Sequence, residues 1–209
     1  MSATMSSQEW DRRYSGTELV WTAQPNRFLV AEAEALAPAR GLDLACGEGR
    51  NAVWLAERGW RMTGVDFSAV ALEKARRLAE ARGVEAEWVV ADLFAYQPEP
   101  NAYDLVVMFY LQVAAERRTP VVRAAAAAVA PGGVLLLVAH DSDNLERGYG
   151  GPPNPAVLYS AEDLVGDLDG SGLLVERAEQ VKRPVATEDG ERVALDALLR
   201  ARRPAAERA

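Results

Sequence analysis

The stretch Gly41-Leu42-Asp43-Leu44-Ala45-Cys46-Gly47-Glu48-Gly49-Arg50-Asn51-Ala52 decides the fold of this chain, together with Asp66 at the end of the next apolar run. It begins as a buried strand, turns at its glycines and continues as the start of a helix. A glycine turn lets a ligand approach the backbone, and a carboxylate after the following strand is placed to bind a ribose. These features together indicate a nucleoside-containing cofactor.

Length and composition limit the class of protein. The 209 residues include 31 acidic and 23 basic side chains, which give a net charge of −8. This length fits one α/β domain over residues 1–209, and the acidic balance argues against nucleic-acid or membrane-surface partners. The single cysteine excludes an internal disulfide, and the N-terminus lacks the apolar core of a signal peptide. We expect a cytoplasmic protein that is a monomer or homodimer.

Strand-like apolar runs alternate with helical patterns along the chain, which is typical of βα units around a mostly parallel sheet. Strands are predicted at residues 41–45, 61–66, 86–91, 103–109 and 134–140. Helices are predicted at residues 27–36, 51–58, 68–82, 119–130 and 161–168, with a glycine- and proline-rich loop at 141–155. Residues 173–183 and 191–202 flank the turn signal Asp189-Gly190. The sequence therefore predicts five parallel strands and a terminal antiparallel hairpin.

The glycine turn is compatible with two kinds of cofactor, a dinucleotide and S-adenosylmethionine. The turn fits the relaxed dinucleotide pattern G-x-G-x-x-G/A, and Asp66 lies about 20 residues further on, as that pattern expects. Asp43 distinguishes the two cofactors, because a carboxylate at the end of the first strand would repel the pyrophosphate of a dinucleotide by about 4 kcal/mol at ~4 Å. The same carboxylate attracts the amino group and sulfonium of S-adenosylmethionine. With Asp66 toward the ribose and Asp92 toward the adenine, three strand-end carboxylates favour this cationic nucleoside over NAD(P).

Five segments resemble, in order and at the expected spacing, the motifs of class I S-adenosylmethionine-dependent methyltransferases. They are residues 43–49, 64–68, 91–93, 103–106 and 131–133. The resemblance covers residues 27–202 and implies a Rossmann-like three-layer sandwich. In this fold the last strand of a seven-stranded, mostly parallel sheet lies between the fifth and sixth strands, antiparallel to the others.

Three further stretches of this chain resemble a bacterial branch of these enzymes that includes tellurite-resistance and thiopurine-type methyltransferases. They are residues 10–14, 21–28 and 47–51. That resemblance implies that residues 1–26 form a lid over the cofactor. Ala45 departs from the common glycine pattern, and its methyl group can be accommodated there. The residues expected to bind the cofactor are Trp21, Asp43, Ala45, Gly47, Gly49, Arg50, Asn51, Asp66, Phe67, Asp92, Leu93 and Phe109. No metal is expected.

The candidates for the acceptor side lie further along the chain. His140, the only histidine, ends the fifth predicted strand and is a candidate general base, although orienting the following loop is an equal alternative. The residues proposed to surround the acceptor are Tyr14, Tyr110, Tyr149, Arg183 and Arg192. The arginines could bind an oxyanion through their guanidinium forks, or simply be solvated charges of an edge strand.

The predicted activity is methyl transfer from S-adenosylmethionine to a small-molecule acceptor, such as a thiol or a chalcogen oxyanion, with S-adenosylhomocysteine as the product. Methyl transfer is an in-line displacement, so a soft nucleophile needs mainly proximity and alignment. Two alternatives stay open at this point. One is an NAD(P)-dependent oxidoreductase, and the other is a non-catalytic sensor of adenosylmethionine or adenosylhomocysteine.

Overall fold

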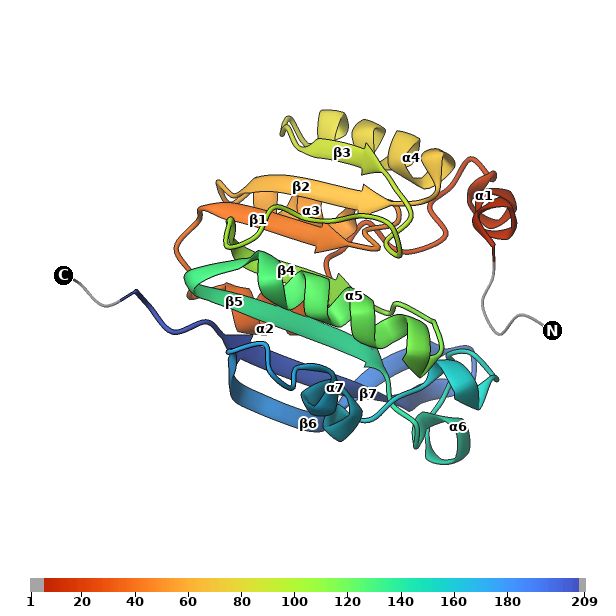
Figure 1. The fold of residues 1–209 in the computed structure, drawn as a ribbon. Coiled ribbons are helices and arrows are strands. Elements are labelled where there is room, and N and C mark those ends of the chain that lie inside the picture. Colours follow the sequence, from red (N-terminus) through yellow and green to blue (C-terminus); the bar gives the residue numbers. More distant parts are fainter. Residues whose placement is uncertain (1–5, 207–209) are drawn as a thin grey trace.

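A computed structural model describes residues 6–206 and shows one twisted sheet with helices on both faces (Figure 1). The seven strands have the order β3-β2-β1-β4-β5-β7-β6. Strands β1 to β5 pair in parallel, whereas β7 is antiparallel to both β5 and β6. The strands are β1 (Arg40–Leu44), β2 (Arg61–Asp66), β3 (Glu87–Val90), β4 (Tyr103–Phe109), β5 (Val129–His140), β6 (Leu174–Thr187) and β7 (Gly190–Arg202). The predicted sheet and the place of its last strand are therefore confirmed.

Two apolar clusters fill the spaces between the sheet and its helices. One contains side chains of α5 and α7, and the other contains side chains of α2 and α3, so the fold has three layers. Ser68 caps α4 by accepting a hydrogen bond from the backbone of Ala71, as helix N-caps do. The helices are α1 (Ser7–Tyr14), α2 (Arg27–Ala33), α3 (Arg50–Ala56), α4 (Ala69–Ala81), α5 (Ala115–Ala128), α6 (Asn144–Arg147), the 3-10 helix η1 (Pro155–Val157) and α7 (Ala161–Asp167).

Several predicted boundaries were wrong. Helix α5 spans 115–128 instead of 119–130 and keeps Pro120 inside it, and β5 begins at Val129 because that residue already pairs with Tyr103. The predicted loop 141–155 contains α6, where the Asn144 side chain bonds to the backbone of Leu195 and Gly150. Helix α1 was not predicted, although Ser6 and Glu9 form a capping box at its start. Tertiary contacts explain the errors at α6 and β5.

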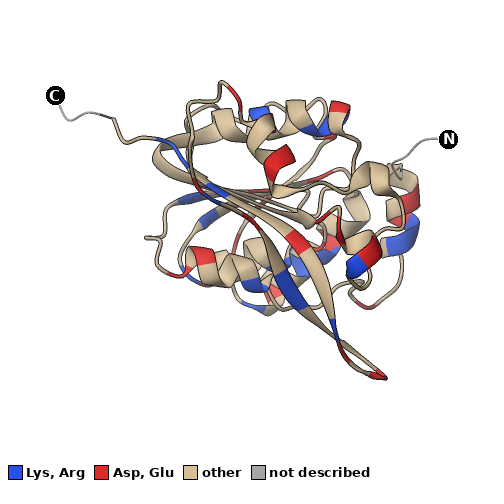
Figure 2. Cartoon of the chain, turned by 90° about the horizontal axis from the view of Figure 1, so that it is seen from below, with Lys and Arg blue, Asp and Glu red and all other residues tan. Residues whose placement is uncertain are grey.

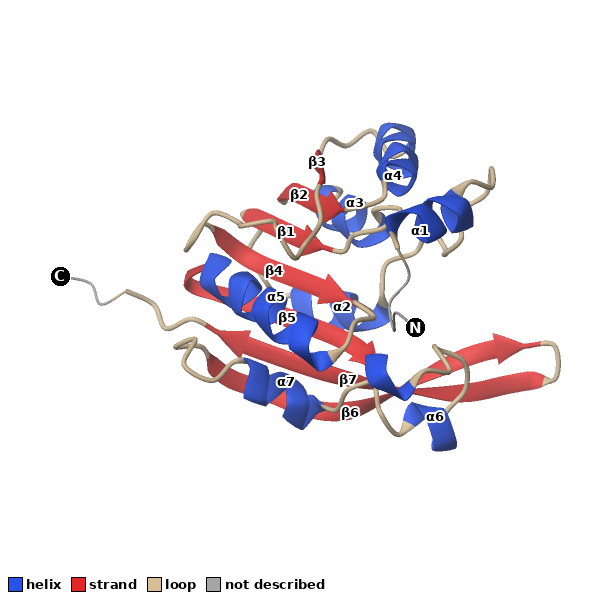
Figure 3. Cartoon of the chain, turned by 45° about the vertical axis from the view of Figure 1, so that its right-hand side comes forward, coloured by secondary structure: helices blue, strands red, loops and turns tan. Residues whose placement is uncertain are grey.

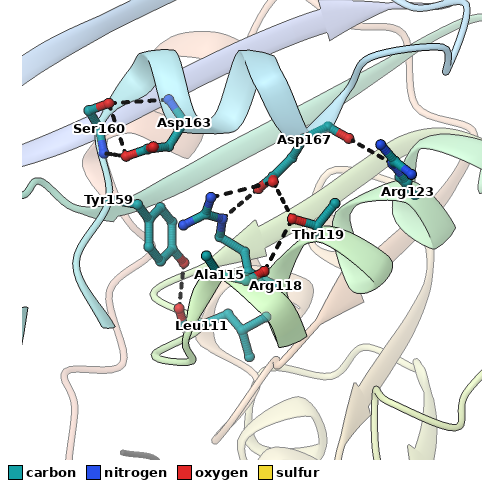
Figure 4. A network of polar contacts seen from close by, with 9 residues as sticks. All are labelled: Leu111, Ala115, Arg118, Thr119, Arg123, Tyr159, Ser160, Asp163 and Asp167. Carbon is teal, nitrogen blue, oxygen red and sulfur yellow. Dashed lines mark hydrogen bonds and ion pairs between the residues drawn. The ribbon is translucent and has the colours of Figure 1, made fainter. Parts of the chain in front are cut away.

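A buried ion pair joins α5 to α7 (Figure 4). The Nε atom of Arg118 lies 2.5 Å from Oδ2 of Asp167, and both side chains are buried. Thr119 donates to the other carboxylate oxygen over 2.5 Å. The Arg118 guanidinium lies 4.5 Å from the ring of Tyr159, whose hydroxyl donates to the carbonyl of Leu111. This network fixes α7 against α5 and holds the loop that follows β4.

The terminal hairpin is longer than the parallel strands beside it. Residues 190–194 of β7 pair only with β6, because the β5 pairing ends where His140 meets Asp196. The hairpin therefore projects past the carboxyl end of β5 (Figure 3). No helix within residues 6–206 is long and apolar enough to cross a membrane.

Candidate functional site

The glycine turn between β1 and α3 has an unusual backbone. Ala45, Gly47 and Gly49 all have positive φ angles, of 57°, 54° and 77°. A Cβ on Gly49 would lie 2.7 Å from side-chain atoms of Ala75 and Trp88, so packing as well as conformation requires glycine there. Ala45 fits sterically as expected, although its left-handed backbone is disfavoured for a residue with a side chain. Such strained positions concentrate at ligand sites.

Asp43 is the last but one residue of β1, before this turn, and is 1% exposed. Its Oδ2 atom has no hydrogen-bond partner among the described residues. Burial, followed by the nearby charge of Asp66, raises the pKa of Asp43 to about 8 against the opposing effect of Arg50. A buried carboxylate without a partner is costly, and a cationic ligand would supply the missing partner. The site therefore fits the ammonium and sulfonium of S-adenosylmethionine.

Asp66 ends β2 beside Asp43 and supports the turn from within. Its Oδ2 atom accepts from the backbone of Gly47 over 2.8 Å, and its Oδ1 atom accepts from that of Ser68 over 2.9 Å. Burial raises the pKa of Asp66, and these backbone hydrogen bonds oppose the rise. Each carboxylate oxygen keeps a second lone pair, which is available for a ribose hydroxyl. Asp66 thus combines a structural role with the predicted one.

The remaining cofactor candidates of β2, β3 and β4 lie at the same carboxyl edge of the sheet. Asp92 is exposed, and its Oδ1 atom accepts from the backbone of Phe94 over 3.0 Å, which closes the loop after β3. Phe67 and Leu93 are half-buried, and Phe109 is buried at the end of β4. A capping role for Asp92 is therefore present, while its exposed carboxylate stays free to contact a ligand.

Glu48, which was not predicted, ties the N-terminal segment to the glycine turn. Its two carboxylate oxygens accept from the backbone of Val20 and Trp21 over 3.0 and 3.1 Å, and Lys74 pairs with it at 3.1 Å. A second tie is the 2.5 Å hydrogen bond from the Ser68 hydroxyl to Asp11. The sequence offered one signal for a role of Glu48, which is its position between Gly47 and Gly49 in the glycine motif. Of the predicted lid, residues 1–5 lie outside the described residues.

Two aromatic candidates of this segment lie beside the glycine turn. Tyr14 is buried, and its hydroxyl would lie 3.2 Å from a Cβ on Gly47, so it covers the turn instead of the acceptor position. Burial raises the pKa of Tyr14. Trp21 is 39% exposed, and the guanidinium of Arg13 lies 5.1 Å from its ring. Tyr14 therefore lies against the glycine turn, where the sequence predicts the cofactor, and its role stays a prediction.

Three acceptor-side candidates meet at the ends of β4 and β5. Tyr110, with φ of 59°, donates its hydroxyl to Oδ2 of Asp196 over 2.9 Å. The Tyr110 and His140 rings have centroids 4.7 Å apart. Arg183 pairs with the same Asp196 at 2.6 Å, and its guanidinium lies 5.6 Å from the Tyr110 ring. The structure thus gathers Tyr110, His140 and Arg183 around a buried aspartate that sequence reasoning missed.

The other two acceptor candidates lie outside this cluster. Tyr149 is 46% exposed in the segment between α6 and η1. Arg192 is exposed opposite Val185, on the part of the hairpin that projects from the sheet. Within residues 6–206 neither side chain forms a hydrogen bond or ion pair with the cluster. For Arg192 the alternative of a solvated hairpin charge agrees with its position.

Two residues at the start of α3 differ in their contacts, and only Asn51 connects the turn to the cluster. Asn51 accepts from the backbone of Asn26 over 2.8 Å, and the Asn26 side chain donates to the Tyr110 hydroxyl over 3.2 Å. Arg50 forms no hydrogen bond or ion pair with the residues described in the structure, and burial lowers its pKa. Asn51 therefore positions its neighbours, whereas Arg50 keeps its donors available for a ligand.

Comparisons with known proteins match the part of the chain that contains the glycine turn. Residues 42–133 match the family described as Methyltransferase domain. Ribosomal RNA small subunit methyltransferase C of Alcanivorax borkumensis is 34% identical over 110 residues, which cover 49% of this chain and 33% of the relative. Demethylmenaquinone methyltransferase of Thermus thermophilus is 35% identical over 125 residues, which cover 59% of this chain and 55% of the relative. The chain thus spans between about a third and about half of these relatives.

Solved structures extend the similarity to nearly the whole chain. The structure described as "Conversion of a Disulfide Bond into a Thioacetal Group during Echinomycin Biosynthesis" is 25% identical, with a TM-score of 0.73, and the match covers 95% of this chain and 92% of that one. A SAM-dependent methyltransferase of Methanosarcina mazei is 18% identical, with a TM-score of 0.67 and coverage of 88% and 100%. Residues 42–133 therefore match a methyltransferase domain, and the chain as a whole has the Rossmann-like fold of these solved structures.

Proposed function

We propose that this protein transfers the methyl group of S-adenosylmethionine to a small-molecule acceptor. The observation that carries the proposal is Asp43, a buried carboxylate whose Oδ2 atom lacks a partner within residues 6–206. A cation relieves the cost of that burial, whereas the pyrophosphate of NAD adds a repulsion of about 4 kcal/mol at ~4 Å.

The cofactor residues divide by the part of the ligand that they would contact. Asp43 faces the cationic end, Asp66 has lone pairs for the ribose, and Asp92 lies where the adenine is expected. Residues 1–26 are proposed as a lid within a single domain of residues 1–209. The full set proposed for the cofactor is Trp21, Asp43, Ala45, Gly47, Gly49, Arg50, Asn51, Asp66, Phe67, Asp92, Leu93 and Phe109. S-adenosylmethionine supplies an activated methyl group that leaves S-adenosylhomocysteine as the product.

A thiol, chalcogen oxyanion or similar small acceptor suits the acceptor side best, in keeping with the resemblance to the tellurite-resistance and thiopurine-type branch. The named relatives act on ribosomal RNA and on a quinone, so these larger molecules are the acceptors against which a small acceptor must be tested. The net charge of −8 supports a small acceptor over RNA. Figure 2 shows acidic and basic positions interspersed over the helices and the hairpin, with acidic residues at the hairpin tip.

Calorimetry and turnover assays test the proposal in two steps. Binding of S-adenosylmethionine and S-adenosylhomocysteine, but not of NAD, is expected. Methyl transfer is then measured with a panel of thiols, selenite, tellurite and phenols, and with ribosomal RNA and transfer RNA as the contrasting class. Preferential NAD binding would contradict the cofactor, and turnover on RNA alone would contradict the acceptor class. Cofactor binding without turnover on either class would favour the sensor alternative.

A further inference from the structure

Asp196 is the one charged residue in the apolar run 193–199 of β7, and it is 0% exposed. A carboxylate in such a place requires partners that offset its loss of hydration. It is nevertheless not part of the glycine turn or of the cofactor residues. Its position follows from the insertion of β7 between β5 and β6, which sets Asp196 directly opposite His140 in the strand register.

The partners of Asp196 come from β5, from β6 and from the residue that follows β4. Its Oδ2 atom accepts from the hydroxyl of Tyr110, just after β4, over 2.9 Å and from Nε of Arg183 of β6 over 2.6 Å. Its Oδ1 atom lies 3.5 Å from Nδ1 of His140 of β5, a long contact, and Nδ1 has no closer partner within the described residues. These are the three acceptor-side candidates that the fold brings together.

The groups around Asp196 determine its protonation state. Burial raises the pKa of Asp196, but the contacts with His140 and Arg183 outweigh it, so that the pKa lies below its usual range. Burial, and then the charge of Asp196, raise the pKa of Tyr110, which therefore stays a hydrogen-bond donor. Asn26 faces the Tyr110 hydroxyl from the other side and is neutral. Asp196 is thus a fixed anion that faces donors only.

We propose that Asp196 is a positioning residue that holds Tyr110, His140 and Arg183 at the acceptor side and keeps the proton of neutral His140 on Nδ1. A carboxylate beside Nδ1 favours the tautomer with hydrogen there, which leaves Nε2 unprotonated. The orientation of His140 is independent of any reaction.

A catalytic use of His140 rests on the proposed function. A bond forms between the acceptor atom and the methyl carbon, and the carbon–sulfur bond breaks with its electron pair remaining on sulfur. The acceptor's proton passes to Nε2 of His140. Asp196 takes no part in these bonds and stabilises the imidazolium that results.

The single histidine makes the proposal directly measurable. Proton–nitrogen correlation NMR of the nitrogen-15-labelled full chain gives the tautomer and titration midpoint of His140 without any acceptor. In the unmodified protein above the midpoint, hydrogen is expected mainly on Nδ1. Hydrogen mainly on Nε2 would overturn the proposal, and this result needs no variant to fold.

Asp196→Asn keeps the shape of the side chain and removes its charge. The fraction of neutral His140 that has hydrogen on Nδ1 is expected to fall, because the charge that favours this tautomer is removed. The matched control is Asp167→Asn, which removes the charge from the other buried aspartate that pairs with an arginine. That variant should leave this fraction unchanged. Equal falls in both variants, or none in Asp196→Asn, would contradict the proposal.

Ligand binding separates failure of this proposal from failure of the proposed function. Asp196→Asn should bind S-adenosylhomocysteine with an affinity within twofold of the unmodified protein, while its methyl-transfer rate falls together with the fraction of His140 that has hydrogen on Nδ1. Absence of cofactor binding in the unmodified protein would refute the proposed function and leave the NMR result valid. A tenfold loss of cofactor affinity in the variant alone would refute the positioning role.

Discussion

We expect Asp43 to make cofactor binding depend on pH. With a pKa of about 8 in the ligand-free protein, it must release a proton before it can pair with a cation. Lowering the pH from 8 to 6 is therefore expected to weaken S-adenosylmethionine binding by up to about tenfold per pH unit. Calorimetry in buffers of different ionisation enthalpy measures both the affinity and the proton released. Asp43→Asn is the control, since its weaker binding should lack this pH dependence.

The same residue affects the stability of the ligand-free fold. Its pKa in the folded state exceeds the ordinary value of 3.8, so the unfolded chain loses its proton first as the pH rises. The destabilisation is absent below about pH 4, grows between about pH 4 and 8, and is constant above that range. Asp43→Asn should therefore gain stability relative to the unmodified protein as the pH rises to 8. A constant gap in urea unfolding at pH 5 and pH 8 would contradict this expectation.

A test of Asp66 in cofactor binding requires a substitution that keeps a hydrogen-bond acceptor, because its side chain also supports the glycine turn. Asp66→Ala leaves the backbone donors of Gly47 and Ser68 without partners, so a loss of about 1–3 kcal/mol in the free energy of unfolding is expected. Asp66→Asn keeps one acceptor oxygen, and its cofactor affinity should fall by about 1.5–3 kcal/mol. Denaturation and calorimetry separate the two effects. Unchanged affinity in a folded Asp66→Asn protein would remove Asp66 from the cofactor site.

Helix α1 and the segment after it depend on Glu48 for their attachment. Glu48→Ala removes the acceptors of two backbone N–H groups and the partner of Lys74. We expect faster proteolysis within residues 15–25 and about tenfold weaker binding of S-adenosylhomocysteine. The control is Glu73→Ala on α4, whose pairs with Arg76 and Arg77 are exposed. Equal cleavage rates in the two variants would show that Glu48 does not hold the segment.

The packing of α5 on α7 depends on the buried pair of Arg118 and Asp167. Arg118→Ala leaves a buried carboxylate without its cation and should lower the free energy of unfolding by about 3–5 kcal/mol. The exposed pair of Arg77 and Glu73 gives the comparison, since Arg77→Ala should cost at most about 1 kcal/mol. Urea denaturation measures both. Similar losses would mean that the buried pair has no special role in holding the two helices.

The whole fold should be stabilised by its ligand. At 100 times its dissociation constant, S-adenosylhomocysteine adds about 2.7 kcal/mol to the free energy of unfolding. For a chain of this length that corresponds to a rise in Tm of about 5–10 °C. Differential scanning fluorimetry measures the rise, with NAD at the same concentration as the control. A rise with NAD but not with S-adenosylhomocysteine would contradict the assigned cofactor.

Much of the architecture was predictable because parallel strands buried on both faces have continuous apolar sequences. Strand β2 has the predicted bounds 61–66, and β1 differs by one residue at each end. The start of β5 was not predictable, because its first residues depend on pairing with β4 across a glycine-containing irregularity. Helix α6 depends likewise on Asn144 meeting β7, a contact between segments far apart in the sequence.

The sequence by itself determined the sheet and the place of its glycine turn, since strand patterns, turn glycines and strand-end carboxylates are local signals. Only the tertiary structure decided that Asp43 lacks a partner, that Glu48 holds the N-terminal segment, and that Asp196 gathers the acceptor-side residues. Each of these depends on side chains from distant segments meeting at the carboxyl edge of the sheet. Burial and partner geometry arise from packing, and no local pattern in the chain encodes them.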